Sequence, residues 1–325
     1  MKLEVFGLSS ERRAEFAPHA AEGLIPGRVI GEHRSHFQVA TDAAELSAEL
    51  TGRLRNAAAQ RSDLAGVGDY VALRLSAGDG NATIEEVLPR TSALIRKASG
   101  EERPQLLAAN VDVVFIVTAP DGDFNLPRIE RLLALVADSG AKPVIVLNKS
   151  DLSDDVAGMT DQITTVAPGI GVHAISARAG EGLSEIEQYF SGNRTVGLIG
   201  SSGVGKSTLT NELLGRAAQA TQEVRAHDNR GRHTTTHRQL FLRPHGGSII
   251  DTPGMRGVER WLPENSNRSN FDDIETIALE CKFSNCSHEA EPKCAVRAAV
   301  ARGELDAERV AGYVRRARGA KSSAR

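Results

Sequence analysis

The first 90 residues alternate short apolar runs with turn residues and contain no long amphipathic helix pattern. Glycine and aspartate mark the turns, for example at Gly27, Gly52, Gly66 and the Gly78-Asp79-Gly80 tripeptide. Short apolar runs between such turns are typical of β-strands. Five strands without a long helix predict a small closed barrel of the OB or SH3 kind over residues 1–90. The candidate strands are residues 2–8, 28–40, 48–55, 69–75 and 83–88.

The pattern changes after a polar stretch at 91–106, which Gly100 and Pro104 interrupt and which we predict to be a linker. Beyond it, continuous β-branched runs alternate with segments that repeat apolar residues at helical spacing, as in parallel α/β units. We therefore predict a mostly parallel sheet over 107–260 and a helical module over 261–325. The candidate strands are 111–118, 143–147, 172–175 and 195–199, and the candidate helices are 126–139 and 183–190.

Composition adds few constraints. The 325-residue chain is 40% hydrophobic and 25% charged, with a net charge of −3, which is typical of a globular protein. Its start lacks the apolar core of a secretory signal, and no apolar run approaches the roughly 20 residues that span a bilayer, so we expect a cytoplasmic protein with no membrane contact. Residues 297–325 carry eight Lys and Arg against three Asp and Glu, which fits either a basic helix end that runs into a disordered tail or a solvated helix face.

Residues 200–207, Gly-Ser-Ser-Gly-Val-Gly-Lys-Ser, fit the phosphate-binding pattern G-x-x-x-x-G-K-[ST] between a predicted strand and a predicted helix. Glycines let backbone amides approach phosphate oxygens, and the helix N-terminus adds positive potential. Lys206 is predicted to reach the β- and γ-phosphates as a catalytic group, and Ser207 to ligate Mg²⁺. The predicted phosphate contacts are Gly200, Ser201, Ser202, Gly203, Val204, Gly205, Lys206, Ser207 and Thr208.

A second motif predicts which nucleotide base the protein binds. Asn148-Lys149-Ser150-Asp151 follows an apolar strand and resembles the N-K-x-D sequence that reads guanine. A carboxylate at Asp151 can accept hydrogen bonds from the guanine N1 and N2 groups, which adenine does not match, and the stem of Lys149 can lie along the base. Ser176 and Ala177 begin the companion S-A-[KR] loop. We therefore expect GTP and GDP as ligands.

A third motif, Asp251-Thr-Pro-Gly254, resembles the D-x-x-G switch, with Asp251 toward Mg²⁺ and the Gly254 amide toward the γ-phosphate. Between it and the phosphate loop lies Gly231-Arg-His-Thr-Thr-Thr236, in which Thr235 or Thr236 is expected to complete the Mg²⁺ shell. The spacing does not decide which of the two threonines binds Mg²⁺. We assign a catalytic role to Thr235.

The motifs occur in an unusual order. The guanine motif at 148 and its companion at 176 precede the phosphate loop at 200 and the switch at 251. The same sheet is kept if the ordinary termini are joined and the chain is opened after the switch, so we predict a circularly permuted GTPase. The chain that leaves the switch then enters the C-terminal module directly, which offers a route for nucleotide-dependent movement.

The position that carries a water-orienting glutamine in Ras-like proteins is Met255. Intrinsic hydrolysis should therefore be slow, and another group must orient the water. His233, in the first switch, is the candidate within this chain; a group from a partner is the alternative.

All three cysteines lie in a short stretch with a histidine, as Cys281-x4-Cys286-x-His288-x5-Cys294. Three thiolates and one imidazole match a closed, tetrahedral structural Zn²⁺ site, whereas a disulfide framework does not suit an odd count. We predict one zinc ion per chain.

Taken together, these features resemble the ribosome small-subunit-dependent, circularly permuted GTPase family (RsgA/YjeQ). The resemblance rests on GRVIG, TGRLR, VGDYV and VLPR in the barrel, then NVDVVFIV, NKSD, GSSGVGKS, RHTTT, DTPGMR and CKFSNCSHEAEPKCAV. It implies an OB barrel, a central GTPase stimulated by the 30S subunit, and a zinc module that grips that subunit. It also implies that the protein acts late in subunit assembly, contacts 16S ribosomal RNA and leaves the subunit at a time set by GTP hydrolysis. The resemblance further implies a role in hydrolysis for the histidine in the first switch, and a monomeric protein.

Two alternatives stay open at the level of sequence. In one, the protein is an RNA-binding module in which GTP is a static ligand, as Met255 suggests. In the other, it is a GTPase that acts on tRNA or another RNA. A GTPase assay with and without small subunits would discriminate between these and the leading interpretation.

Overall fold

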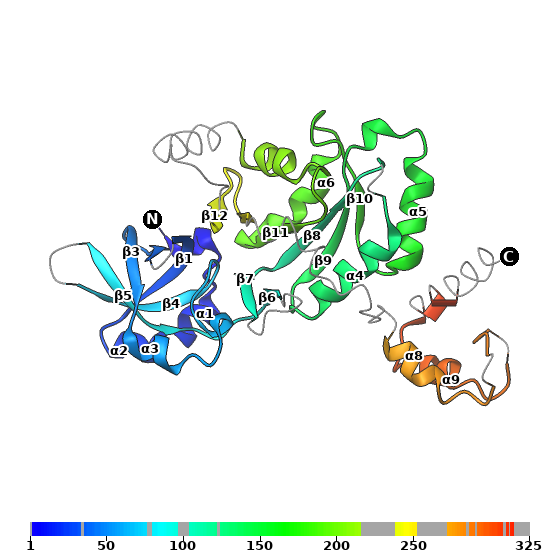
Figure 1. The fold of residues 1–325 in the computed structure, drawn as a ribbon, viewed down its shortest axis with the longest axis horizontal. Coiled ribbons are helices and arrows are strands. Elements are labelled where there is room, and N and C mark those ends of the chain that lie inside the picture. The colour runs from blue at the N-terminus through cyan, green and yellow to red at the C-terminus, as the bar shows by residue number, and fades with distance from the viewer. Residues whose placement is uncertain are drawn as a thin grey trace.

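The fold was analysed in a computed structural model, which contains a β-barrel beside an α/β sheet, and a small C-terminal helical module (Figure 1). Among the described residues, no helix is long and apolar enough to cross a membrane. The structure describes residues 2–33, 36–76, 80–96, 104–121, 124–215, 238–251, 272–283, 286–289, 291–307, 310–311 and 313–314.

The N-terminal barrel has five strands in the order β1-β2-β3-β5-β4, and the pairing of β1 with β4 closes it. All its pairings are antiparallel except that of β3 with β5, which is parallel. This confirms the predicted closed barrel of five strands and its OB type. The strands are β1 (Ile25–His33), β2 (His36–Ala40), β3 (Glu45–Leu50), β4 (Tyr70–Leu75) and β5 (Asn81–Val87).

The expected number of barrel strands was right, but three of the five predicted strands differ from the structure. The predicted single strand at 28–40 is the β1–β2 hairpin, and the predicted strand at 2–8 is a 3-10 helix, η1 (Leu3–Phe6). Leu3 and Phe6 are three residues apart, so a helical turn buries both on one face, and Gly7 ends it at a φ of 84°. Two short helices follow, α1 (Ser10–Glu15) and α2 (Ala17–Ala21).

The second half of the predicted strand at 48–55 is also helical. Its last residues belong to α3 (Gly52–Ala57), because the Thr51 side chain accepts a hydrogen bond from the Leu54 amide and caps a new helix. A 3-10 turn, η2 (Arg61–Asp63), precedes β4. Within the stretch 91–106, the chain forms β6 (Ala93–Arg96), which pairs with β7 (Gln105–Ala109).

The central sheet has the order β10-β9-β8-β11-β13-β12, parallel except for β12, as predicted for this domain. Continuous apolar sequences form its strands because helices cover both faces. The strands are β8 (Val113–Thr118), β9 (Lys142–Leu147), β10 (Val172–Ala174), β11 (Thr195–Ile199), β12 (Arg238–Leu242) and β13 (Ser248–Asp251). The helices are α4 (Leu126–Ala137), η3 (Ser150–Leu152), α5 (Val156–Val166), α6 (Leu183–Glu187) and η4 (Gln188–Asn193).

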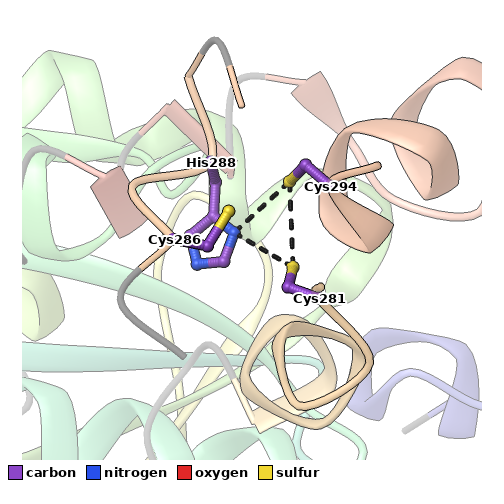
Figure 2. A group of neighbouring side chains, drawn as sticks. All are labelled: Cys281, Cys286, His288 and Cys294. Carbon is purple, nitrogen blue, oxygen red and sulfur yellow. Dashed lines mark hydrogen bonds between the residues drawn. The ribbon is translucent and has the colours of Figure 1, made fainter. Parts of the chain in front are cut away.

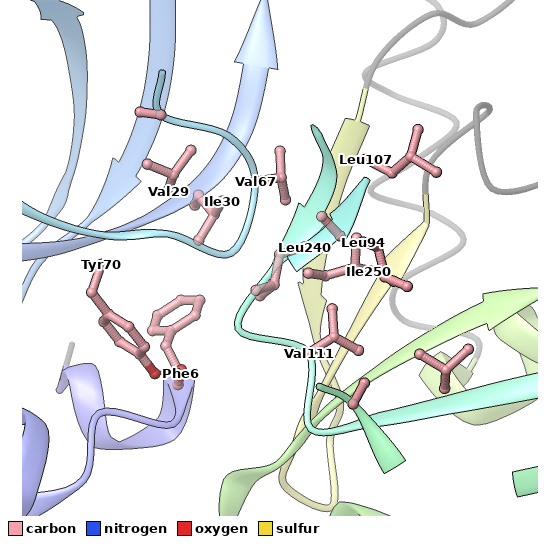
Figure 3. Packing of buried hydrophobic residues seen from close by; sticks show 14 of the residues in the cluster. Phe6, Val29, Ile30, Val67, Tyr70, Leu94, Leu107, Val111, Leu240 and Ile250 are labelled. Carbon is pink, nitrogen blue, oxygen red and sulfur yellow. Dashed lines mark hydrogen bonds between the residues drawn. The ribbon is translucent and has the colours of Figure 1, made fainter. Parts of the chain in front are cut away.

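The barrel and the central sheet are joined edge to edge. Strand β12 pairs with β13 on one side and with β1 of the barrel on the other, so that Gly31, Gln239 and Asp251 occupy one row across three strands. One apolar cluster runs through this junction, from Val29 and Tyr70 in the barrel to Ile250 in the sheet (Figure 3). The barrel is thus packed against the strand that ends in the candidate switch aspartate.

Arg28 lies inside this junction and is 1% exposed. Its guanidinium donates to the Asn110 carbonyl oxygen at 3.1 Å and to Thr195 Oγ1 at 2.8 Å on the sheet side, and to the Phe6 and Gly68 carbonyl oxygens on the barrel side. Burial lowers the pKa of Arg28, and its guanidinium lies over the Tyr70 ring. These hydrogen bonds offset the cost of burying the group and link the two domains.

The C-terminal module contains α8 (Asp272–Ala278) and α9 (Ala295–Ala301). Within the part of this module that the structure describes, the core is small: Ile274, Val296, Ala299, Leu305 and Val310 are buried together with Cys294. A core of this size rarely stabilises a domain unless a metal or disulfide assists it.

Candidate functional site

The candidate phosphate loop connects the end of β11 with a helix that begins at Lys206. Two of its glycines are required by close contacts. A Cβ at Gly200, where φ is 139°, would lie 2.1 Å from the Val117 carbonyl oxygen, and one at Gly205, where φ is 91°, would lie 2.3 Å from Asn148 Nδ2. Neither distance is possible for a side chain, so glycine alone fits at both positions. The loop is consequently packed against the strand and the loop beside it.

Lys206 bridges this loop from within. Its side chain is largely buried, and Nζ donates to the Gly200 carbonyl oxygen at 2.5 Å and to the Ser201 carbonyl oxygen. Ser202, Gly203, Ser207 and Thr208 are exposed around it. The ammonium group therefore lies at the concave side of a loop whose outer residues are accessible, which is the arrangement that a phosphate-binding lysine needs.

Asn148 connects three loops of the site. It is 2% exposed, and its Nδ2 donates to the Val204 carbonyl oxygen at 2.8 Å, while its Oδ1 accepts from the Ala177 amide at 3.0 Å. The side chain therefore joins the phosphate loop to the S-A-R loop, and its own backbone carries the guanine motif. All three loops follow parallel strands, so they meet at the carboxyl edge of the sheet, where ligands of open α/β sheets bind.

The other residues predicted to bind guanine lie in the loop of Asn148 and in the S-A-R loop. Lys149 has a φ of 61°, and its Nζ lies 2.9 Å from Asp121 Oδ2. Asp151 is exposed in η3, whereas Ser176 is fully buried, and its amide and carbonyl groups pair with Glu181. An exposed carboxylate, which accepts hydrogen bonds, beside an ordered loop is the arrangement expected for reading the edge of a guanine base.

Asp251 is the last residue of β13, which pairs in parallel with β11 through Val196↔Ile249 and Gly197↔Ile250. The aspartate therefore lies at the same edge of the sheet as the phosphate loop. The other predicted residues of the two switches, His233, Thr235, Thr236, Gly254 and Met255, lie outside the described residues.

Two contacts of this site were not predicted from the motifs. Asp121, which pairs with Lys149, and Arg128, whose Nη1 donates to Ser201 Oγ at 2.6 Å, both lie in or just after the β8–α4 connection. Neither belongs to a motif, and no local spacing links them to residues about 30 and 70 positions further along the chain. The one available signal was that β8 directly precedes both residues in the sequence. The carboxyl end of β8 lies next to the phosphate loop, so residues that follow β8 can reach this loop.

The cysteine cluster brings all four predicted metal ligands together (Figure 2). Cys281 Sγ lies 3.8 Å from Cys294 Sγ, and His288 Nδ1 lies 3.6 Å and 3.5 Å from these two sulfurs. One ligand atom from each of the four residues, Cys286 included, falls within 4.8 Å of the others. A tetrahedral ion with metal–sulfur and metal–nitrogen bonds of about 2.3 and 2.0 Å needs separations of about 3.8 and 3.5 Å. The cluster therefore has the geometry to bind a metal ion.

Local structure supports this cluster. Cys294 is the N-cap of α9, and its Sγ accepts from the Arg297 amide at 3.5 Å. Ser287 and Glu291 close the loop between the ligands, since the Ser287 amide donates to Glu291 Oε1 at 2.7 Å. Burial lowers the pKa of His288, which favours the neutral imidazole that metal coordination requires.

Residues 87–261 match the family model described as RsgA GTPase. The chain is 43% identical over 313 residues to the "Small ribosomal subunit biogenesis GTPase RsgA 2" of Lactiplantibacillus plantarum, covering 96% of this chain and 88% of that protein.

Two solved structures share the fold. YjeQ from Thermotoga maritima superposes with a TM-score of 0.60 at 26% identity, covering 90% of this chain and 96% of that chain. YloQ, described as a circularly permuted GTPase, gives a TM-score of 0.55 at 25% identity, covering 92% of this chain and 96% of that chain. The permuted order of the motifs and the identity over nearly the whole chain show that this protein belongs to the RsgA family of GTPases.

Proposed function

We propose that this protein hydrolyses GTP during late maturation of the 30S ribosomal subunit, binds 16S ribosomal RNA, and uses hydrolysis to time its release. The observation that carries the proposal is the double hydrogen bond of Asn148, which links a phosphate loop to a guanine loop in one site. The name of the Lactiplantibacillus plantarum relative, a small ribosomal subunit biogenesis GTPase, supports the choice of partner.

In the proposed mechanism, Asp151 accepts hydrogen bonds from guanine, Lys149 covers the base, and Ser176 and Ala177 form the loop beside it. Backbone amides of residues 200–208 surround the phosphates, and Lys206 moves from its two carbonyl acceptors to the β- and γ-phosphate oxygens. Ser207 and one of Thr235 and Thr236 would supply oxygen ligands for Mg²⁺, and Asp251 would hold the ion through water; the ion would neutralise developing charge on the phosphates. The Gly254 amide senses the γ-phosphate.

The attacking water requires a further group, because Met255 has no hydrogen-bonding capacity in the place of the usual glutamine. We propose His233 for this role, on the loop between the phosphate loop and β12. Orientation of water by a positioned polar group typically contributes about 10²-fold to a rate, which fits an enzyme that turns over slowly on its own and faster when a partner orders the switch.

We propose that the metal of the C-terminal cluster is a single structural Zn²⁺. Three thiolates and one imidazole fill a tetrahedral shell, so no position is left open for substrate. Cys281, Cys286, His288 and Cys294 would hold α8, the ligand loop and α9 together.

The barrel and the C-terminal module are the proposed contacts to the small subunit. Strand β1 of the barrel pairs with β12 at Gln239, and Gln239 in turn pairs with Asp251 of β13. This connection supports communication between an RNA bound to the barrel and the switch. We propose that the protein acts in the cytoplasm as a monomer.

The deciding experiment is a GTPase assay with and without purified small subunits. The proposal predicts strong stimulation at saturating subunit. Binding of GTP without stimulation would favour the static-ligand alternative, and stimulation by tRNA in place of the subunit would favour a different RNA substrate.

A further inference from the structure

Arg128 contacts the phosphate loop from a helix that no nucleotide motif includes. It lies in the first turn of α4, after Pro127. Asn125 caps this helix by accepting from the Arg128 amide at 2.9 Å. The cap and the proline fix the backbone at the start of the helix, and with it the point from which the Arg128 side chain leaves the helix.

The guanidinium reaches the loop across two neighbouring strands. Helix α4 follows β8, the phosphate loop follows β11, and these strands pair in parallel. Arg128 Nη1 donates to Ser201 Oγ at 2.6 Å, and Ser201 is only 5% exposed. A short hydrogen bond from a charged donor to a buried hydroxyl is stronger than a neutral one, and its loss would leave the hydroxyl poorly satisfied.

Ser201 is held a second time, through its backbone. Lys206 Nζ donates to the Ser201 carbonyl oxygen and to that of Gly200. Two cations therefore fix one residue, Arg128 through the side chain and Lys206 through the peptide group. When Lys206 turns toward a nucleotide phosphate, the contact from Arg128 does not have to change.

We propose that Arg128 is a positioning residue of the phosphate loop, which holds Ser201 through its hydroxyl so that residues 200–205 keep the phosphate-binding conformation before nucleotide arrives. The ligand class is a guanine nucleoside di- or triphosphate, and the inference rests on the proposed nucleotide site. Preorganisation of this kind increases affinity because the loop does not have to be ordered on binding.

The test is a double-mutant cycle on GDP affinity, measured by fluorescence titration of the full chain with a labelled GDP. Arg128→Ala and Ser201→Ala should each weaken binding about tenfold, the share of one charge-assisted hydrogen bond. Because both changes remove the same contact, the double variant should lose about tenfold rather than about a hundredfold. A purely structural role of Arg128 in helix α4 would not produce this coupling to Ser201.

Arg194→Ala is the matched control. Arg194 is exposed and immediately precedes β11, whereas the phosphate loop follows it. The variant removes the same charge from the opposite end of the same strand, so it should bind GDP with parental affinity. Methylguanidinium added to Arg128→Ala should restore part of the affinity, whereas the same addition to Ser201→Ala should not.

Lys206→Ala separates this inference from the proposed function. If the parental protein binds GDP and Lys206→Ala does not, the nucleotide site stands whatever Arg128 does. Parental affinity of Arg128→Ala, or additive losses in the double variant, would then overturn the positioning role alone. Should Arg128→Ala fail to fold, Ser201→Ala decides, because parental GDP affinity in that variant also overturns the proposal.

Discussion

In the central domain, hydrogen bonds between protein groups join the loops of the nucleotide site, whereas in the C-terminal module four metal-ligand side chains converge beside a small core. Asn148 alone connects the phosphate loop to the S-A-R loop, and Lys206 has acceptors within its own loop. Among the described residues of the module, the buried core comprises six side chains, one of which is the ligand Cys294. The fold builds the first site, whereas a metal ion bound at the second site would itself stabilise the fold of the module.

This difference has consequences for how each region should respond to mutation. A scaffold stabilised by a buried sheet tolerates loss of a ligand contact and loses affinity in proportion to the contact removed. A module stabilised by its metal should lose its structure when one ligand is lost, since metal binding and folding are then a single equilibrium.

The largest expected effect is therefore that of Cys286→Ala. The metal content should fall from one ion per chain to none, because structural zinc contributes about 10 kcal/mol or more to folding of small modules. Limited proteolysis should then cleave within residues 272–314 while GDP binding persists. Elemental analysis of protein purified without chelators measures the metal directly.

Ser287→Ala is the control for the metal site. Ser287 lies between two of the predicted ligands in the sequence, but its amide and hydroxyl groups donate hydrogen bonds to Glu291 and not to a ligand. It should keep its ion. A parental protein that contains no metal would contradict the site, and loss of GDP binding in Cys286→Ala would contradict the independence of the two regions.

Asp151→Asn should change base selectivity without unfolding the domain. Xanthine has a carbonyl group where guanine has an amino group, so an amide can pair where the carboxylate did. We expect GTP affinity to fall by about 10³-fold and xanthosine triphosphate to become the preferred ligand, since sites built on matched hydrogen bonds reject mismatched partners strongly. Competition titration with the two nucleotides measures this, and continued preference for GTP would show that Asp151 does not read the base.

The sequence was most informative where chemistry depends on neighbouring residues. The phosphate loop, the guanine motif and the four metal ligands each lie in a short segment, and the spacing of such a segment is constrained by the group that it binds. The barrel was harder to predict, because the apolar residues Leu3, Val5 and Phe6 fit either a strand that buries Leu3 and Val5 or a helical turn that buries Leu3 and Phe6, and packing decides between them.

Contacts between distant segments could not be predicted at all. Arg28 is an ordinary charged residue in the sequence, yet it is buried where the barrel meets the central sheet, with acceptors at Asn110 and Thr195. The Arg128–Ser201 contact likewise depends on which strands are adjacent. Such pairs follow from topology, and only the complete fold determines them.

Asn148→Ala tests the claim that the nucleotide site is assembled by protein groups. The change leaves the Val204 carbonyl oxygen and the Ala177 amide without their partner in a buried position. We expect a loss of about 2–4 kcal/mol in the free energy of unfolding, together with weaker GDP binding. Chemical denaturation of the protein without nucleotide measures the first quantity. An unchanged unfolding curve would mean that nucleotide, rather than Asn148, joins these loops.

The smallest of these effects concerns hydrolysis. Here the comparison is between the groups that bind nucleotide, which this chain holds in place, and the group that orients water, for which the chain has Met255 in place of the usual glutamine. His233 lies on the loop that we expect to close over the γ-phosphate, whereas the proposed contacts of Lys206, Ser207 and Asp251 with GTP·Mg²⁺ do not depend on it. His233→Ala should therefore leave nucleotide affinity nearly unchanged and lower turnover stimulated by the small subunit about 10²-fold. Steady-state kinetics with saturating subunit would separate the two quantities.

Two further variants make this last result interpretable. His233→Gln keeps a polar end and should recover part of the rate, which excludes a loss caused only by displacement of Thr235 or Thr236. Lys206→Ala should instead reduce binding and turnover together, because its ammonium group contacts phosphate in the ground state as well as the transition state. If His233→Ala hydrolyses GTP at the parental rate on small subunits, the water is oriented from outside this chain, and ribosomal RNA is then the source of the missing group. The nucleotide site would in that case be complete for binding and would depend on its partner for catalysis.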